Sequence, residues 1–203
     1  MTGYAAILLA GGAARRMGGV DKPARAVGGR PMLHRVLEAV TDADQRIVVG
    51  SSGPVPRGVR TTREEPPGGG PVAATAAGSA LLDPGTTTVA LLAADLPLLT
   101  AAAVAELRRA LDVPLDGPAG ALACYVDGDG RRQHLCAIWR VPALRAALDR
   151  LAATRGGSLD GAPVRGLLAG IPVREVSWSG SGPPPWFDCD TDEDVRRAEE
   201  WTR

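Results

Sequence analysis

The chain has 203 residues, of which 45% are hydrophobic and 23% charged, proportions that are ordinary for a globular protein. Its 23 acidic and 23 basic residues cancel to a formal net charge of zero, which argues against a protein that binds nucleic acid or a membrane surface through bulk charge. No apolar run reaches the roughly 18 residues of a membrane span, and no cationic region precedes the first apolar run. We therefore expect a single domain, residues 1–203, in the cytoplasm.

A glycine-rich loop follows the first predicted strand. The apolar run Ala5–Ala10 is typical of a strand buried on both faces, and Gly11 and Gly12 let the backbone turn sharply and expose its N–H groups. The cationic residues of the loop are Arg15, Arg16 and Lys22. A loop of this kind at the end of a buried parallel strand indicates a binding site for a phosphate chain.

Lys22 is the only lysine in the chain, because the other 22 of the 23 basic residues are arginines. A single lysine can occur at any position by chance. Its place inside a glycine-rich loop favours the other interpretation, in which a compact ammonium group contacts phosphate where the planar fork of an arginine would need more room.

The next elements alternate between helix and strand. We predict a helix over Pro31–Val40, whose apolar residues recur at helical spacing, and then short strands over Arg46–Gly50 and Val59–Arg63. The segment Glu64–Pro71 is too rich in proline and glycine for regular structure. Its glycine spacing fits a dinucleotide fingerprint, but we reject that interpretation because such a fingerprint should follow the first strand directly. We therefore expect a loop that borders a nucleotide.

A carboxylate stands at the end of the second strongly apolar strand. After a predicted helix over Val72–Leu82, the run Thr87–Ala94 predicts a strand that leads into Asp95, and Pro97 keeps the residue before it extended. A carboxylate just beyond the carboxyl end of a central parallel strand faces the ligand crevice of an α/β sheet. Asp95 is therefore predicted to bind a metal ion or a ligand, and a simple turn residue is the alternative.

The second half of the chain contains a predicted hairpin. Thr100 caps a helix that extends to Leu111, and strands over Ala119–Val126 and Gln133–Arg140 are joined by a polar turn that contains glycine. This pair interrupts the alternation of strand and helix, so we expect it to form an antiparallel edge of a mostly parallel sheet. The other predicted elements are a helix over Val141–Ala153, a short helix within Leu159–Leu168 and a strand over Val173–Val176.

Two aspartates precede the last predicted helix. Asp188 and Asp190 alternate, so on an extended segment they face the same side. Thr191 is the predicted N-cap of the helix, and the acidic residues that follow it suit the first helical turn. Asp190 is a candidate second carboxylate ligand of a metal ion, and an aspartate that assists the cap is the alternative.

These candidates suit one kind of chemistry. The sequence has no GxSxG nucleophile elbow, and the Walker pattern is absent because Lys22 is followed by proline and not by serine or threonine. A glycine-rich turn, several cations and one or two carboxylates suit transfer of a nucleotidyl group, which depends on positioning and charge neutralisation more than on a protein nucleophile. The candidate catalytic residues are Lys22, Arg16 and Asp95.

The sequence LAGGAARRMGGVDK, followed by the segment Gly29–Leu33, resembles the signature of the molybdenum cofactor guanylyltransferases. The likeness continues in GGGPVAA, in DLP at Asp95, in QHLCAIWR and in FDCDTDEDV. The Gly11–Gly12 pair and the ending GVDK favour these enzymes over cytidylyl relatives. The resemblance implies a Rossmann-like, three-layer α/β/α fold and transfer of GMP from GTP to molybdopterin-bound molybdenum cofactor, with Mg²⁺ and release of pyrophosphate.

The resemblance also implies which residues bind. Carried over by position, the nucleotide-binding residues are Leu9, Ala10, Gly11, Gly12, Arg15, Lys22, Gly50, Glu65 and Asp95. Asp95 would also bind Mg²⁺, with Asp190 as a further candidate. The chain departs from the family at positions that often hold asparagine, where it has Gly50, Asp188 and Asp190, and at Glu65, where aspartate is usual. The alternatives are a nucleotidyltransferase that uses CTP or a sugar-phosphate acceptor, and a non-catalytic nucleotide-binding domain.

Overall fold

The protein is described by a computed structural model that covers residues 3–11, 22–50, 53–113 and 120–202. A seven-stranded sheet forms its centre, with the strand order β5-β4-β1-β6-β8-β7-β9. These strands are β1 (Ala5–Leu9), β4 (Gln45–Val49), β5 (Val59–Thr62), β6 (Thr88–Ala93), β7 (Leu122–Val126), β8 (Arg132–Arg140) and β9 (Val173–Ser177). A small second sheet pairs β2 (Ala26–Val27) with β3 (Arg30–Pro31).

Strand β1 lies in the middle of the parallel part of the large sheet. It pairs in parallel with β4 on one side and with β6 on the other, so that Ile7 lies opposite both Ile47 and Leu91. All five residues of β1 are buried, as its continuous apolar run predicts for a strand covered on both faces. The parallel pairing brings the carboxyl ends of β1, β4 and β6 to one edge of the sheet.

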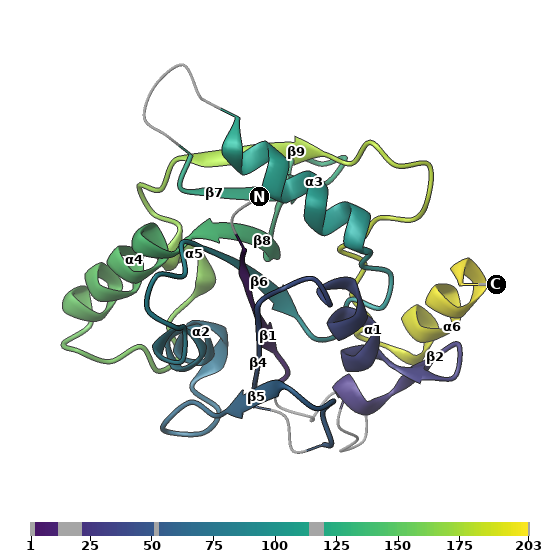
Figure 1. Ribbon diagram of the computed structural model, residues 1–203, viewed down its shortest axis with the longest axis horizontal. Helices are drawn as coiled ribbons and strands as arrows, with labels where there is room; N and C mark the ends of the chain where they lie inside the picture. The colour runs from purple at the N-terminus through teal and green to yellow at the C-terminus, as the bar shows by residue number, and fades with distance from the viewer. Residues whose placement is uncertain (1–2, 12–21, 51–52, 114–119, 203) are drawn as a thin grey trace.

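Helices cover both faces of this sheet, which confirms the predicted three-layer α/β/α class. They are α1 (Met32–Ala39), α2 (Gly70–Ala80), α3 (Ala101–Asp112), α4 (Val141–Thr154), α5 (Val164–Leu167) and α6 (Asp192–Trp201), with a 3-10 turn η2 (Lys22–Ala24). Figure 1 shows α1 and α3 on one side of the sheet and α2, α4 and α5 on the other, while α6 lies further out beside β2. Within the described ranges, no helix is both long and apolar enough to cross a membrane.

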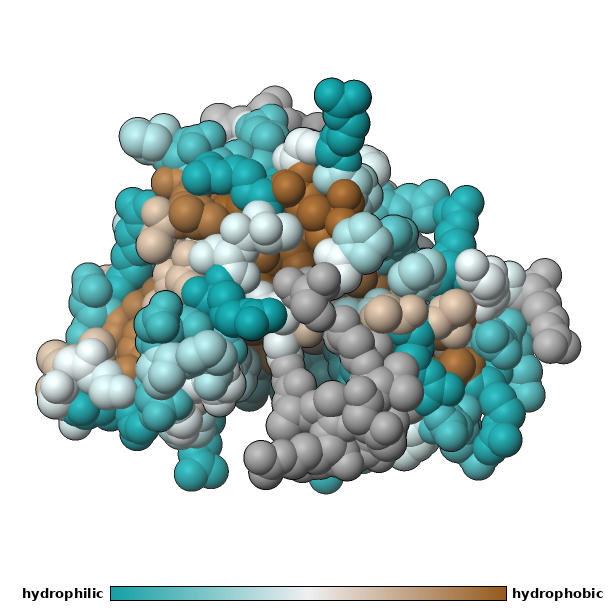
Figure 2. Space-filling model, turned by 90° about the horizontal axis from the view of Figure 1, so that it is seen from below, coloured by the Kyte–Doolittle hydropathy of each residue, from teal (hydrophilic) through white to brown (hydrophobic). Residues whose placement is uncertain are grey.

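Each face of the sheet has its own apolar core. Leu8, Leu92 and Ile138 pack on the side of α1 and α3, and Ile7, Leu91 and Trp139 pack on the side of α2 and α4. Figure 2 shows one outer face of the molecule, where hydrophilic residues surround several smaller hydrophobic areas, an ordinary mixture for a protein surface.

The predicted hairpin is present, but it does not form the edge of the sheet. Strand β8 pairs antiparallel with both β6 and β7, and β9 pairs parallel with β7 as the outermost strand. The reason is burial. Residues Cys136 to Trp139 of β8 are all buried, so that part of the strand needs neighbours on both sides, whereas β9 carries the charged residues Arg174 and Glu175 that an edge strand tolerates.

Candidate functional site

A pocket of 420 Å³ opens where β1 and β6 end and β8 begins. Because β8 runs antiparallel to β6, its first residues lie at the same edge of the sheet as the last residues of β6. The lining includes Leu9 and Gly11 at the end of β1, Ala93 and Asp95 at the end of β6, His134 on β8, and Trp186 and Asp188 from the segment before α6. The position agrees with the general rule that ligands of open α/β sheets bind at the carboxyl ends of the strands.

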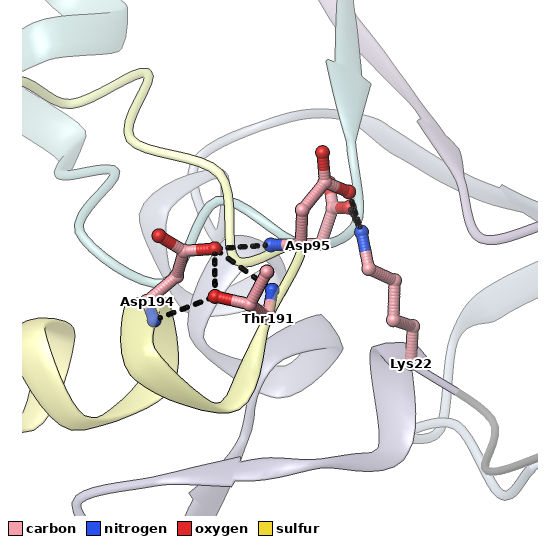
Figure 3. A network of polar contacts seen from close by, with 5 residues as sticks. Lys22, Asp95, Thr191 and Asp194 are labelled. Atoms are coloured by element: carbon pink, nitrogen blue, oxygen red, sulfur yellow. Dashed lines mark hydrogen bonds and ion pairs between the residues drawn. The ribbon is translucent and has the colours of Figure 1, made fainter. Parts of the chain in front are cut away.

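Lys22 joins two carboxylates at this edge. Its Nζ donates to Oδ2 of Asp95 at 2.9 Å and also to Oδ1 of Asp190. The side chains of Lys22 and Asp95 are 24% and 22% exposed, and that of Asp190 is 53% exposed. Figure 3 shows Lys22 extended toward Asp95. The structure thus brings together three of the predicted site residues from parts of the sequence that are far apart.

Backbone hydrogen bonds fix Asp95 in place. The N–H of Ala94 donates to the carbonyl of Leu9 at 3.0 Å, and the carbonyl of Asp95 accepts from the N–H of Cys189 at 3.2 Å. The first bond continues the pairing of β6 with β1 past the end of both strands. The second bond attaches the segment before α6 to the same point, so the carboxylates of Asp95 and Asp190 approach one another.

The cap of α6 holds Asp190 by its backbone. Thr191 and Asp194 form a capping box, in which the Oγ1 of Thr191 accepts from the N–H of Asp194 at 3.2 Å and Oδ2 of Asp194 accepts from the N–H of Thr191 at 2.8 Å. Oδ2 of Asp194 also accepts from the N–H of Asp190 at 3.1 Å. Figure 3 shows this arrangement at the start of the helix. The cap is therefore made by Thr191 and Asp194, and the side chain of Asp190 turns to Lys22.

The charges of the site are coupled. Burial by itself would lower the pKa of Lys22, but its hydrogen bonds to Asp190 and Asp95 outweigh burial, and the pKa is raised. Desolvation raises the pKa of Asp188, and the negative charges of Asp190 and Asp95 raise it further. One ammonium group therefore stands among three carboxylates in the part of the site that the structure describes.

The carboxylates of the site suit a hard divalent cation whose remaining ligands come from the substrate. In the described part of the chain, no three His, Cys, Asp or Glu side chains are grouped as a metal site. Asp95 and Asp190, however, share a single cationic group. Mg²⁺ is usually bound through one or two carboxylates together with substrate phosphates and water, so Asp95 and Asp190 could hold it when a nucleotide supplies the phosphate oxygens.

The main chain approaches closely between the end of β1 and the end of β4, where Gly11 and Gly50 carry no side chains. A Cβ added to Gly50 would lie 2.7 Å from the Cα of Gly11, and Gly50 has a φ of +89°. The N–H of Ala10 donates to the carbonyl of Val49 at 2.8 Å. With this backbone, a side chain does not fit at Gly50, so any contact of this residue with a nucleotide comes from its main chain.

A buried glutamate lies beside these glycines. Glu64 is 6% exposed, and its Oε1 accepts from the N–H of Gly68 at 3.0 Å. A Cβ on Gly11 would lie 3.7 Å from the same oxygen. In the described part of the protein, no hydrogen-bond donor reaches the buried Oε2 of Glu64. Glu65, the residue assigned to the nucleotide from the sequence, is exposed, and Glu64 is the neighbour that lies beside Gly11.

Several other sequence-based assignments have a structural outcome. Gly12, Arg15 and Arg16 lie outside the described residues. His134, for which no functional role was predicted, lines the pocket, and burial followed by the charge of Arg132 lowers its pKa. Trp186 was not singled out at all. It directly precedes the FDCDTDEDV motif, but only the fold shows that it lines the pocket.

Comparison with known proteins shows which family the chain resembles. Residues 6–171 match the MobA-like NTP transferase domain. The chain is 31% identical over 201 residues to the molybdenum cofactor guanylyltransferase of Nitrobacter hamburgensis, which covers 95% of this chain and 91% of the relative. Both sequence comparisons extend over most of the chain, as the motif resemblance predicts.

Solved structures share the fold. Molybdopterin-guanine dinucleotide biosynthesis protein A from Archaeoglobus fulgidus aligns over 97% of both chains with a TM-score of 0.70 at 17% identity. The 2-C-methyl-D-erythritol 4-phosphate cytidylyltransferase from Thermus thermophilus aligns over 98% of both chains with a TM-score of 0.69 at 20% identity. The fold alone therefore does not distinguish a guanine nucleotide from a cytosine nucleotide. The sequence match does identify the family: the chain belongs to the MobA-like NTP transferases and is a nucleotidyltransferase.

Proposed function

We propose that this protein transfers GMP from GTP to molybdenum cofactor and releases pyrophosphate, with Mg²⁺ bound at Asp95 and Asp190. Family membership and the names of its relatives support the acceptor class. The observation that carries the choice of nucleotide is the buried carboxylate of Glu64 beside Gly11.

Glu64 places hydrogen-bond acceptors beside Gly11, a residue of the pocket lining. Its Oε2 is buried without a donor among the described residues, and leaving a buried acceptor unsatisfied costs free energy. Guanine presents two neighbouring donors, N1–H and the 2-amino group, and an ionised carboxylate is an acceptor only. Cytosine and adenine present an amino group beside a ring acceptor, which a carboxylate repels. Glu64 therefore favours guanine over these two bases.

The residues at the ends of β1 and β6 act on the triphosphate. Lys22 stabilises negative charge on the phosphates, as a positioned ammonium does in this kind of transfer. When bound, Mg²⁺ polarises the reacting phosphoryl group and offsets the repulsion between two anionic reactants. Asp95 and Asp190 hold their carboxylates toward that point through the bonds to β1 and the α6 cap.

The reaction is a displacement at phosphorus. An oxygen of the acceptor's phosphate forms a bond to the α-phosphorus, and the bond from that phosphorus to the bridging oxygen breaks, so that pyrophosphate leaves with the electron pair. The part of the pocket beyond Asp95, lined by His134 and Trp186, is the place we assign to the acceptor. Trp186 is held there by a tilted contact with Tyr125, at 5.0 Å between ring centroids.

Two measurements test this function. GTP with Mg²⁺ should raise the melting temperature more than CTP, ATP or UTP at equal concentration, and saturation at about 100 times the dissociation constant should add about 2.7 kcal/mol of stability. Pyrophosphate should then appear from GTP only when molybdenum cofactor is supplied. A larger shift with CTP would contradict the choice of guanine. Release of pyrophosphate from GTP when a sugar phosphate replaces molybdenum cofactor would contradict the choice of acceptor.

A further inference from the structure

The ammonium group of Lys22 occupies the space between two carboxylates that we assign to a metal ion. Its Nζ lies 2.9 Å from Oδ2 of Asp95 and also bonds to Oδ1 of Asp190. The same side chain is the one we assign to the phosphates. It does not fill both roles at once, because a divalent cation between the two carboxylates would stand directly against the ammonium charge.

Resting on the proposed function, we propose that Lys22 is an internal counter-ion of the metal site. In the nucleotide-free enzyme it neutralises Asp95 and Asp190 and keeps divalent cations out. The triphosphate draws Lys22 away by its larger negative charge and frees both carboxylates for the ion. Metal and nucleotide therefore bind together, and neither carboxylate is available to the metal alone.

Features of the chain around Lys22 make this exchange possible. The side chain is flexible and ends in a compact charge, whereas a planar arginine fork would hold its partners in a fixed geometry. The 3-10 turn that begins at Lys22 is anchored, because Arg25 pairs with Asp192 and donates its N–H to the carbonyl of Lys22 at 3.0 Å. The ammonium group can therefore change partners while the backbone of the turn stays in place.

Binding of Mn²⁺ to the full chain without nucleotide tests the proposal. Electron paramagnetic resonance of free Mn²⁺ would give the affinity of the wild type, of Lys22→Met, of Lys22→Arg and of Lys22→Met combined with Asp190→Asn. Lys22→Met should bind Mn²⁺ at least about tenfold more tightly than the wild type, a change of the size that neighbours of a metal site produce. Lys22→Arg should stay as weak as the wild type, and the double variant should lose the gain.

Arg25→Met is the matched control. It removes a positive charge that follows the same turn, and the native Arg25 pairs with Asp192. It should leave Mn²⁺ affinity unchanged. The proposal is overturned if Lys22→Met binds Mn²⁺ no more tightly than the wild type, or if Arg25→Met gains as much. Should Lys22→Met fail to fold, Lys22→Gln provides the same comparison with a neutral side chain that ends in a polar amide. The experiment contains neither GTP nor acceptor, so its outcome is independent of whether the proposed function holds.

Discussion

Gly50 and Gly11 touch through their backbones: a Cβ on Gly50 would lie 2.7 Å from the Cα of Gly11. This contact joins the loops that follow β4 and β1, and Glu64 lies against the same point, since its Oε1 would be 3.7 Å from a Cβ on Gly11. The part of the site that we assign to the base is thus built from two bare main chains and one buried carboxylate. Its shape depends on the absence of side chains at both glycines.

Gly50→Ala should destabilise the protein and weaken GTP binding. The φ of +89° disfavours alanine, and the added methyl group meets backbone, which cannot move as a side chain can. We expect a loss of about 1–3 kcal/mol for the strained backbone alone, measured by urea denaturation. Gly58→Ala is the control, because Gly58 has a φ of +82° with nothing within 4 Å of an added Cβ. Equal losses in the two variants would show that the contact with Gly11 is unimportant.

Glu64→Gln should reduce discrimination between nucleotides. The substitution keeps the size of the side chain but replaces one acceptor oxygen by a donor, so the amide no longer matches two donors of guanine. The free energy of GTP binding should become less favourable by about 1.5–3 kcal/mol, the range for hydrogen bonds to a charged group. The free energy of CTP binding should change little. Isothermal titration with both nucleotides measures the difference. Glu65→Gln, at an exposed neighbouring position, should behave as the wild type.

The two neighbouring glutamates show what can and what cannot be predicted from the sequence. Strands β1 and β6 were predicted because burial on both faces leaves a continuous apolar run, and Asp95 followed from its place after β6. Nothing local distinguishes Glu64 from Glu65, because the choice depends on how the loop after β5 turns toward Gly11. The position of β8 inside the sheet also depends on tertiary packing, because the charged residues of β9 suit an edge strand but do not show which strand it pairs with.

Asp95→Asn should leave the fold intact and abolish most of the metal-dependent turnover. The amide keeps the shape of the side chain but lacks the negative charge that a divalent cation requires. Loss of one preorganised charged group should slow release of pyrophosphate by roughly 10²–10³. Binding of GTP without metal should be unchanged or tighter, since a carboxylate near the phosphates is gone. Turnover at the wild-type rate would show that Asp95 is only a turn residue.

Thr191→Ala should affect both stability and turnover. Loss of the N-cap of α6 should cost about 1 kcal/mol. It should also loosen Asp194, whose Oδ2 accepts from the hydroxyl of Thr191 at 2.7 Å and from the N–H of Asp190 at 3.1 Å, and through Asp194 the segment that carries Asp190. Thr100→Ala is the matched control. Thr100 caps α3 by accepting from the N–H of Ala103 at 3.2 Å, outside the pocket lining. Both variants should lose stability, and only Thr191→Ala should lose turnover, in denaturation and pyrophosphate assays.

His134 should titrate below the ordinary histidine value, because burial and then the charge of Arg132 lower its pKa. A histidine that is harder to protonate in the folded state makes the protein less stable as the pH falls, since the unfolded chain takes up the proton first. This loss should appear as the pH falls from about 6.5 toward the lower, folded pKa.

The chain has only two histidines, His34 and His134, so the measurement is direct. Proton NMR of the imidazole signals, assigned with His34→Gln, gives the pKa of His134 in the folded protein. Denaturation across about pH 5–7 should show a shallower loss of stability in His134→Gln than in His34→Gln, and other titrating groups contribute to both variants alike. Addition of an acceptor phosphate should raise the pKa of His134, because a nearby anion favours the imidazolium form. If the signal of His134 does not respond to the acceptor, this side of the pocket is not the acceptor site.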